Sequence, residues 1–184
     1  MTKLLDKSRF LSYVLRHKPE AIQLKLDKEG WANIQFIIDA SQDTKTQLTR
    51  AEVEQIVSED DKGRYAISPG GEKIRANQGH STSSVDIKFK KAIPPIKLYH
   101  GTTKEVAELV LKQGLKAMKR HYVHLSIDIA TAINVAGRRK NETQLLQIDC
   151  KAMVAEGFKF SISDNNVWLI EEVPAKYISK VNHE

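Results

Sequence analysis

The sequence predicts an α+β protein built from two lobes, the first of which is a winged-helix lobe. In the first half of the chain, three segments with helical spacing of apolar residues precede two short strands. In the second half, helical segments are inserted among mostly short strands. A polar, lysine-containing stretch that ends in Pro94-Pro95 separates the two patterns. We therefore place the first lobe at residues 1–85, a connector at 86–95 and the second lobe at 96–184.

Three helices are expected in the first lobe. Residues 8–17 place their apolar side chains on one helical face, and Pro19 ends this helix because it disfavours helical geometry at the preceding residue. Alternating apolar residues at 22–26 predict a short strand, and the isoleucines at 34–38 predict a second helix. The third helix begins at a capping box, Thr-Arg-Ala-Glu at 49–52.

A β-hairpin is expected next, with strands at 64–68 and 72–75 around a Pro-Gly-Gly turn. Its second strand leads into residues 74–81, Ile-Arg-Ala-Asn-Gln-Gly-His-Ser, which carry a cation, amides, an imidazole and a hydroxyl with little apolar content. The planar fork of Arg75 matches a phosphate, and Gly79 lets backbone approach a ligand closely. The alternative interpretation is a polar loop after a hairpin, since loops are polar by default.

The second lobe is expected to open with a strand at 96–99. A capping box at 102–105, Thr-Thr-Lys-Glu, starts a helix that Gly114 ends. The remaining periodicity predicts a helix at 128–137 and strands at 122–126, 143–149, 158–162 and 167–171.

Composition narrows the classes of protein. No apolar run approaches the roughly 20 residues of a membrane helix, and the N-terminus has no signal-peptide core, so we expect a cytoplasmic protein.

The single cysteine, Cys150, excludes an internal disulfide and is interpreted as a buried apolar residue, with a nucleophile as the alternative. The net charge is +6, of which +1 lies before residue 86 (13 Lys/Arg against 12 Asp/Glu) and +5 after it (16 against 11). The positive net charge therefore favours an anionic partner.

The motifs that usually carry nucleotide or metal chemistry are missing from the sequence. It has no G-x-G-x-x-G, no phosphate loop ending in Gly-Lys-Ser/Thr and no cysteine or histidine pair at zinc spacing. Arginine and histidine instead stand at particular places in the predicted elements. Arg16 and His17 lie at a helix end, Arg75 and His80 at the junction of the lobes, His100 after a strand, His124 within a strand, and Arg138 and Arg139 after a helix. A lone histidine of this kind is more often structural, and Arg16 and His17 also suit a helix C-terminus electrostatically. If several of these arginines and histidines lie close together in the folded protein, they would form a functional site.

Four segments carry a resemblance to a known family. Residues 11–19 (Leu-Ser-Tyr-Val-Leu-Arg-His-Lys-Pro), 74–81, 98–102 (Leu-Tyr-His-Gly-Thr) and 123–126 (Val-His-Leu-Ser) resemble, in this order and spacing, the RNA 2′-phosphotransferases of the KptA type. The similarity covers nearly the whole chain. It implies a winged-helix lobe joined to a lobe of the ADP-ribosyltransferase type, which would explain NAD use without a Rossmann glycine pattern.

The resemblance also implies a two-step reaction. An internal RNA 2′-phosphate attacks ribose C1″ of NAD and expels nicotinamide, and the ribose 2″-hydroxyl then attacks phosphorus. The products are RNA with a free 2′-hydroxyl and ADP-ribose 1″,2″-cyclic phosphate. The expected partners are thus NAD, consumed as co-substrate, and a 2′-phosphorylated RNA such as tRNA. We expect a monomer that needs no metal, because arginines take the role of Mg²⁺.

The resemblance assigns roles to residues at matching positions. The family's Arg-His-Arg-Arg catalytic set falls on Arg16, His17, Arg75 and Arg139. Arg139 is preferred to Arg138 because the strand at 144–148 then falls in register, although Lys140 and Asn141 stand where the family often has histidine and glycine. The residues expected to hold NAD are His100, Gly101, Thr102, His124 and Ser126. Those expected to bind RNA are Gln78, Gly79, His80 and Ser81.

Two rival functions remain open. A winged-helix regulator of nucleic acid is disfavoured by the +1 charge of the first half, since sequence-independent DNA binding rests on phosphate neutralisation. An ADP-ribosyltransferase could use the same site on a nucleic-acid phosphate end, a protein or a small molecule and stop after the first step. An assay for ADP-ribose 1″,2″-cyclic phosphate separates the two transferases.

Overall fold

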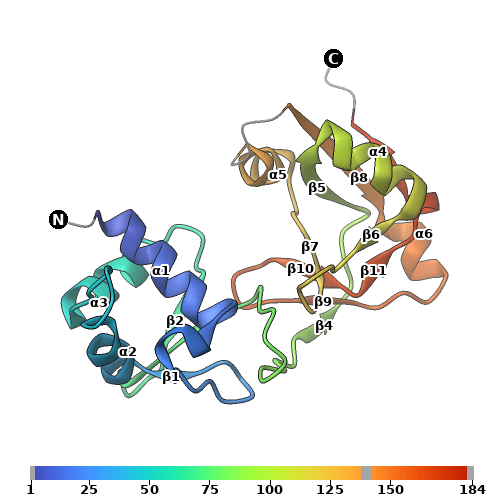
Figure 1. Cartoon of the computed structure of the whole chain (residues 1–184). Helices are drawn as coiled ribbons and strands as arrows, with labels where there is room; N and C mark the ends of the chain where they lie inside the picture. The colour runs from blue at the N-terminus through green and yellow to red at the C-terminus, as the bar shows by residue number, and fades with distance from the viewer. Residues whose placement is uncertain (1–2, 138–141, 182–184) are drawn as a thin grey trace. The chain divides into compact units, whose positions relative to one another are not determined.

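The computed structural model describes residues 3–137 and 142–181, which form a mixed α+β structure with several small antiparallel sheets (Figure 1). The chain divides into two compact units, Met1–Lys88 and Phe89–Glu184. Each unit has its own cluster of buried apolar side chains. Among the described residues, no helix has both the length and the apolar character needed to cross a bilayer.

The first unit packs three helices against a small sheet. Its elements are α1 (Leu4–Arg16), η1 (Pro19–Ile22), β1 (Ala32–Asn33), α2 (Ile34–Ser41), α3 (Arg50–Ser58), β2 (Tyr65–Ile67) and β3 (Lys73–Ala76). The strands are antiparallel in the order β1-β3-β2. Leu11 and Leu15 of α1, Ile34 and Ile37 of α2, and Ile74 of β3 are fully buried in the core of this unit.

Most local predictions for the first unit are confirmed. The capping box is present, because the Thr49 hydroxyl accepts from the backbone of Glu52 while the Glu52 carboxylate accepts from the backbone of Thr49. The hairpin β2–β3 pairs as expected. The strand predicted at 22–26 is wrong. Pro19 starts the 3₁₀ turn η1, and the residues after it run into the core without pairing to a strand of the described chain. Burial, rather than sheet pairing, explains the alternation.

The second unit holds a larger set of short strands. Its elements are β4 (Lys90–Ala92), β5 (Lys97–Thr103), α4 (Lys104–Gln113), β6 (Leu115–Lys116), β7 (Val123–Leu125), α5 (Ile129–Ala136), β8 (Thr143–Asp149), α6 (Cys150–Ala155), β9 (Phe160–Ile162), β10 (Trp168–Ile170), β11 (Glu172–Val173), η2 (Ala175–Tyr177) and β12 (Ile178–Lys180). They form the antiparallel sheets β4-β9-β10-β7, β12-β8-β5 and β11-β6. Leu98, Leu146, Ile148 and Met153 are fully buried in this unit.

The start of α4 corrects one prediction by a single residue. Strand β5 runs on to Thr103, which pairs with Thr143, so the helix begins only at Lys104. Thr103 is therefore the N-cap, and its hydroxyl accepts from the backbone N–H of Val106. The expected capping box, which needs Thr102 rather than Thr103 as the N-cap, does not form. Gly114 does end the helix, as expected, with φ of +81°.

Several elements of the second unit were not predicted, namely β4, β6, α6, β11, η2 and β12. The expected connector contains β4, a lysine-rich strand at the edge of its sheet. Edge strands often carry charged side chains, which prevent pairing with other chains. The same charges remove the apolar pattern by which a strand is recognised in a sequence. Helix α6 follows β8 directly, with the Asp149 side chain as its cap. Cys150 at the start of α6 is buried, and burial raises the pKa of its thiol to about 12. The interpretation of Cys150 as a buried apolar residue is confirmed.

Candidate functional site

The C-terminal end of α1 presents Arg16 and His17. The helix ends at Arg16, and His17 caps it by donating its backbone N–H to the carbonyl of Tyr13. Only 9% of Arg16 is exposed. Its guanidinium lies 6.0 Å from the centroid of the Tyr65 ring, and its Nη2 donates to the carbonyl of Arg64 over 3.4 Å. The guanidinium of Arg16 thus lies at the beginning of β2, in contact with the Arg64 carbonyl and near the Tyr65 ring.

The segment at 77–81 returns to that helix end. The backbone N–H of Ser81 donates to the carbonyl of Arg16 over 2.9 Å, and Nδ1 of His17 lies 3.0 Å from Oγ of Ser81. Gly79 adopts φ of +90°, and an added Cβ would lie 3.7 Å from Cδ of Arg16. The first two motifs of the sequence, which are far apart along the chain, therefore form one cluster inside the first unit.

Arg75 lies on the side of the sheet that faces away from the core. In β3, Ile74 and Ala76 are buried, and Arg75 between them projects from the opposite face. Its side chain is 15% exposed, its Nη1 lies 3.6 Å from Oε2 of Glu29, and its guanidinium carbon lies 4.7 Å from the centroid of the Trp31 ring. Neither Glu29 nor Trp31 was predicted as a site residue.

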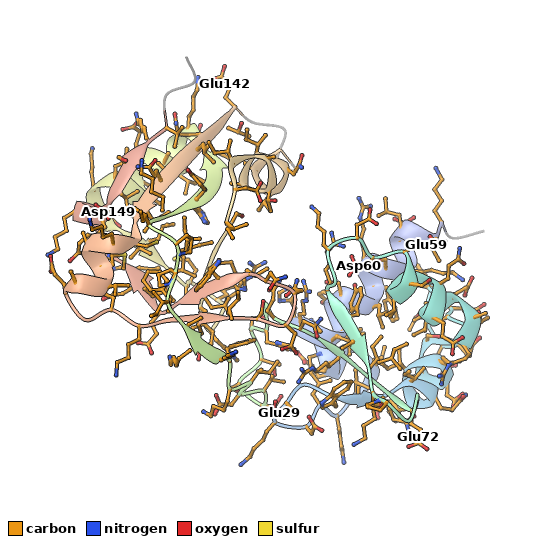
Figure 2. All side chains as sticks on the ribbon, turned by 180° about the vertical axis from the view of Figure 1, so that it is seen from behind. Glu29, Glu59, Asp60, Glu72, Glu142 and Asp149 are labelled. Atoms are coloured by element: carbon orange, nitrogen blue, oxygen red, sulfur yellow. The ribbon has the colours of Figure 1, made fainter. Side chains whose placement is uncertain are left out.

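Two polar residues of the 74–81 motif, Asn77 and His80, are buried and pack within the first unit. His80 is only 4% exposed, and an added Cβ on Gly30 would lie 3.0 Å from its Nε2. Asn77 was also missed by sequence reasoning. Its Nδ2 donates to the carbonyl of Gly63 over 2.7 Å, and its backbone N–H donates to the same Arg64 carbonyl that accepts from Arg16. The side chain of Arg64 is in turn paired with Asp60, labelled in Figure 2. Asn77 therefore helps to place the carbonyl that contacts Arg16.

In the second unit, the five predicted NAD residues lie on two neighbouring segments, β5 and the end of β7 with the residue after it. Tyr99 and Ser126 exchange two backbone hydrogen bonds, of 2.9 and 2.8 Å. Nδ1 of His100 lies 3.2 Å from the carbonyl oxygen of His124. The two segments that carry the predicted residues are thus direct neighbours.

Gly101 has a packing role that its prediction as a cofactor residue did not include. An added Cβ would lie 2.1 Å from the carbonyl oxygen of Ala132 and 2.8 Å from the Cβ of Ala136. Both alanines belong to α5, so the absence of a side chain at Gly101 lets this helix lie directly on β5. Thr102, the next residue, is 4% exposed.

One face of the sheet β4-β9-β10-β7 carries His124. Lys91, Ser161, Leu169 and His124 are successive cross-strand partners and so share that face. A cavity of about 280 Å³ is lined by Lys91, Ser161, Leu169 and Tyr122, among others. Three of the four residues on the face that bears His124 therefore line this cavity, and His124 itself does not.

The arginine expected after α5 lies outside the described residues, as do Lys140 and Asn141. Helix α5 ends at Ala136 with Gly137 as its C-cap, so the choice between Arg138 and Arg139 stays a prediction. Within residues 3–137 and 142–181, no group of three or more acidic, histidine or cysteine side chains could hold a metal ion. That the reaction needs no metal also stays a prediction.

Comparison with known proteins adds a family match. The model of the RNA 2′-phosphotransferase, Tpt1/KptA family, matches residues 2–172. A protein of Fusobacterium nucleatum is 46% identical over 170 residues, which cover 92% of this chain and 94% of the relative. A protein of Pseudomonas aeruginosa is 47% identical over 173 residues (94% of each chain), and one of Escherichia coli K12 is 46% identical over 176 residues (96% and 95%). All three are described as probable RNA 2′-phosphotransferases.

Proposed function

The chain belongs to the Tpt1/KptA family of RNA 2′-phosphotransferases, and on this premise we propose that it removes an internal 2′-phosphate from RNA. The family uses NAD, which this protein would consume as its second substrate. The observation that carries the proposal is the cluster in the first unit, where Arg16 and His17 meet Ser81. This cluster offers a guanidinium and an imidazole to a phosphate.

In the first step, the RNA 2′-phosphate attacks C1″ of the NAD ribose, and nicotinamide leaves with the electrons of the broken bond. The nucleophile is already an anion, so no base has to activate it. Arg16 and Arg75 would hold the phosphate and direct one of its oxygens at C1″. Both guanidinium groups lie against aromatic rings in this structure, which supports a role that depends on orientation.

In the second step, the ribose 2″-hydroxyl attacks phosphorus and the bond to the RNA 2′-oxygen breaks. Negative charge builds on the non-bridging oxygens, where arginine stabilises it most. We assign to His17 the transfer of the proton from the 2″-hydroxyl to the departing 2′-oxygen. The contact between Nδ1 of His17 and Ser81 supports this assignment, because it sets the orientation of the ring. Arg139 would supply the fourth member of the catalytic set.

The binding roles are proposed for groups that suit them chemically. Imidazoles, hydroxyls and backbone amides hydrogen-bond readily to the amide and ribose hydroxyls of NAD. We assign NAD to His100, Gly101, Thr102, His124 and Ser126, and RNA to Gln78, Gly79, His80 and Ser81. We further propose that the first unit is a winged-helix lobe, that the second is of the ADP-ribosyltransferase type, and that the protein acts as a monomer.

The test is a reaction of purified protein with NAD and an oligoribonucleotide that carries one internal 2′-phosphate. The expected products are the dephosphorylated oligonucleotide, nicotinamide and ADP-ribose 1″,2″-cyclic phosphate, with an oligonucleotide lacking the 2′-phosphate as control. If ADP-ribose is instead transferred to other acceptors and no cyclic phosphate forms, the protein is an ADP-ribosyltransferase and the proposal is wrong.

A further inference from the structure

A tight turn at residues 27–31 lies directly before β1, and none of its residues belongs to the predicted site. Four hydrogen bonds hold it. Asp27 donates its N–H to the carbonyl of Trp31 and accepts at its own carbonyl from Gly30, over 3.1 and 2.9 Å. One carboxylate oxygen of Asp27 accepts from the backbone N–H groups of Glu29 and Trp31, over 3.0 and 2.9 Å. The turn is therefore a defined structure organised by Asp27.

The turn places the aromatic ring of Trp31 beside Arg75, the arginine proposed to bind the RNA phosphate. Ala32 pairs with Ile74 in the β1–β3 ladder, so the antiparallel register continues to place Trp31 opposite Arg75. The guanidinium carbon of Arg75 lies 4.7 Å from the centroid of the Trp31 ring, a stacking distance for a cation over an aromatic face. On the other side of β3, the partner of Arg75 is the small residue Ala66. Trp31 is therefore the large side chain beside Arg75 in this sheet.

The same turn also supports the end of the motif. Gly30 adopts φ of +79°, which a residue with a side chain tolerates poorly. A Cβ added to Gly30 would lie 3.0 Å from Nε2 of His80. The carbonyl of Lys28 accepts from the backbone N–H of Asp86 over 2.8 Å. The turn thus contacts both the 77–81 segment and the chain that follows it.

We propose that the 27–31 turn is a positioning element, in which Trp31 orients the guanidinium of Arg75 for the RNA phosphate and Gly30 seats His80. The inference rests on the proposed function, because it takes Arg75 to bind the phosphate. A guanidinium presents its donors in a plane, and bidentate contact with a phosphate requires that plane to face the anion. A ring packed against the guanidinium, as that of Trp31 is, restricts the rotation that would turn this plane away from the anion. Misplacement of a catalytic group by about 1 Å can cost about 100-fold in rate.

The experiment compares Trp31→Phe, which keeps a ring, with Trp31→Leu, which keeps only apolar bulk. Each change is made in the wild type and in the Arg75→Ala background. The measurements are the affinity for a 2′-phosphorylated oligoribonucleotide without NAD, the single-turnover rate with NAD, and the KM for NAD. Thermal unfolding shows whether each variant is folded. The matched control is Glu72→Gln, a change to an exposed side chain of the same unit that keeps the backbone carbonyl bonded to Ile34 (Figure 2).

Trp31→Leu is expected to weaken oligonucleotide binding and to slow turnover about 10- to 100-fold, with the KM for NAD unchanged. Trp31→Phe should stay within about threefold of wild type, because the face that stacks is retained. In the Arg75→Ala background, Trp31→Leu should add no further loss, since a residue that acts through Arg75 has nothing left to orient.

Two results would overturn the inference. One is a folded Trp31→Leu variant with wild-type binding and turnover. The other is a loss in the Arg75→Ala background as large as the loss in wild type, which would mean that Trp31 acts independently of Arg75. Failure of the proposed function is seen separately, because wild type would then form no cyclic phosphate, and the binding measurement would still decide the role of Trp31.

Discussion

Nδ1 of His17 lies 3.0 Å from Oγ of Ser81, although 64 positions separate the two residues in the sequence. The contact joins the end of α1 to the end of the 74–81 motif, and the bond from the Ser81 N–H to the Arg16 carbonyl supports it. The proton transfer proposed for His17 needs a defined orientation of the imidazole, and a hydroxyl beside one ring nitrogen supplies it.

We expect Ser81→Ala to slow the second step about three- to tenfold, because one hydrogen bond is worth about 0.5–1.5 kcal/mol. Ser81→Thr keeps the hydroxyl and should retain most of the activity. The measurement is the single-turnover rate of cyclic phosphate formation. A rate for Ser81→Ala equal to that of wild type would show that the hydroxyl does not assist His17.

Arg75→Ala and Arg139→Ala should slow the second step more than the first. In the first step the phosphate loses negative charge as it bonds to C1″, so an arginine stabilises the starting state at least as much as the transition state. In the second step charge builds on the phosphoryl oxygens, and arginine is worth most there. Both variants should accumulate RNA whose 2′-phosphate carries ADP-ribose. A time course with radiolabelled 2′-phosphate resolves the species, and slow variants without intermediate would refute the argument.

Arg139 should matter more than Arg138. Loss of a charge-assisted contact from a catalytic site costs about 3–4 kcal/mol, or about 100- to 1000-fold in rate, whereas loss of a surface arginine costs little. Separate alanine variants, assayed under saturating NAD, decide between the two. If Arg138→Ala is the crippled variant, the predicted register after α5 is wrong by one residue.

Gly101→Ala should destabilise the second unit. Its Cβ would meet the carbonyl oxygen of Ala132 at 2.1 Å, so α5 would have to move away from β5. Overpacking of this kind costs about 1–3 kcal/mol. Thermal unfolding should show a lower midpoint. The KM for NAD should rise as well, because the proposed NAD-binding residues His100 and Thr102 flank the displaced position. Gly70→Ala is the control, since an added Cβ there meets no atom of the described residues within 4 Å. Equal midpoints for the two variants would contradict the packing argument.

Activity should survive removal of divalent metal. Arginines in the proposed site would offset the phosphoryl charge that Mg²⁺ offsets in other enzymes. The rate after dialysis against a chelator should therefore match the untreated rate. A loss of activity that added Mg²⁺ restores would show that the arginines are insufficient.

The sequence by itself determined the features that depend on neighbours along the chain. The apolar face of α1, the capping box at Thr49 and the hairpin β2–β3 follow from local periodicity and local hydrogen-bonding chemistry. The four motifs likewise indicate the family, because motif order and spacing are properties of the linear chain.

Only the tertiary structure decided which distant groups meet. A local pattern does not report whether an alternating segment has a strand beside it, so residues 22–26 predict a strand where none forms, and β4 is hidden within a charged stretch. The same limit hides Trp31 and Asn77. The ring of Trp31 lies beside Arg75 because of the register of β1 against β3. Asn77 contributes because, in the folded chain, its backbone N–H and the guanidinium of Arg16 both donate to the carbonyl of Arg64. Contacts of this kind depend on chain closure over dozens of residues, which no short window of sequence records.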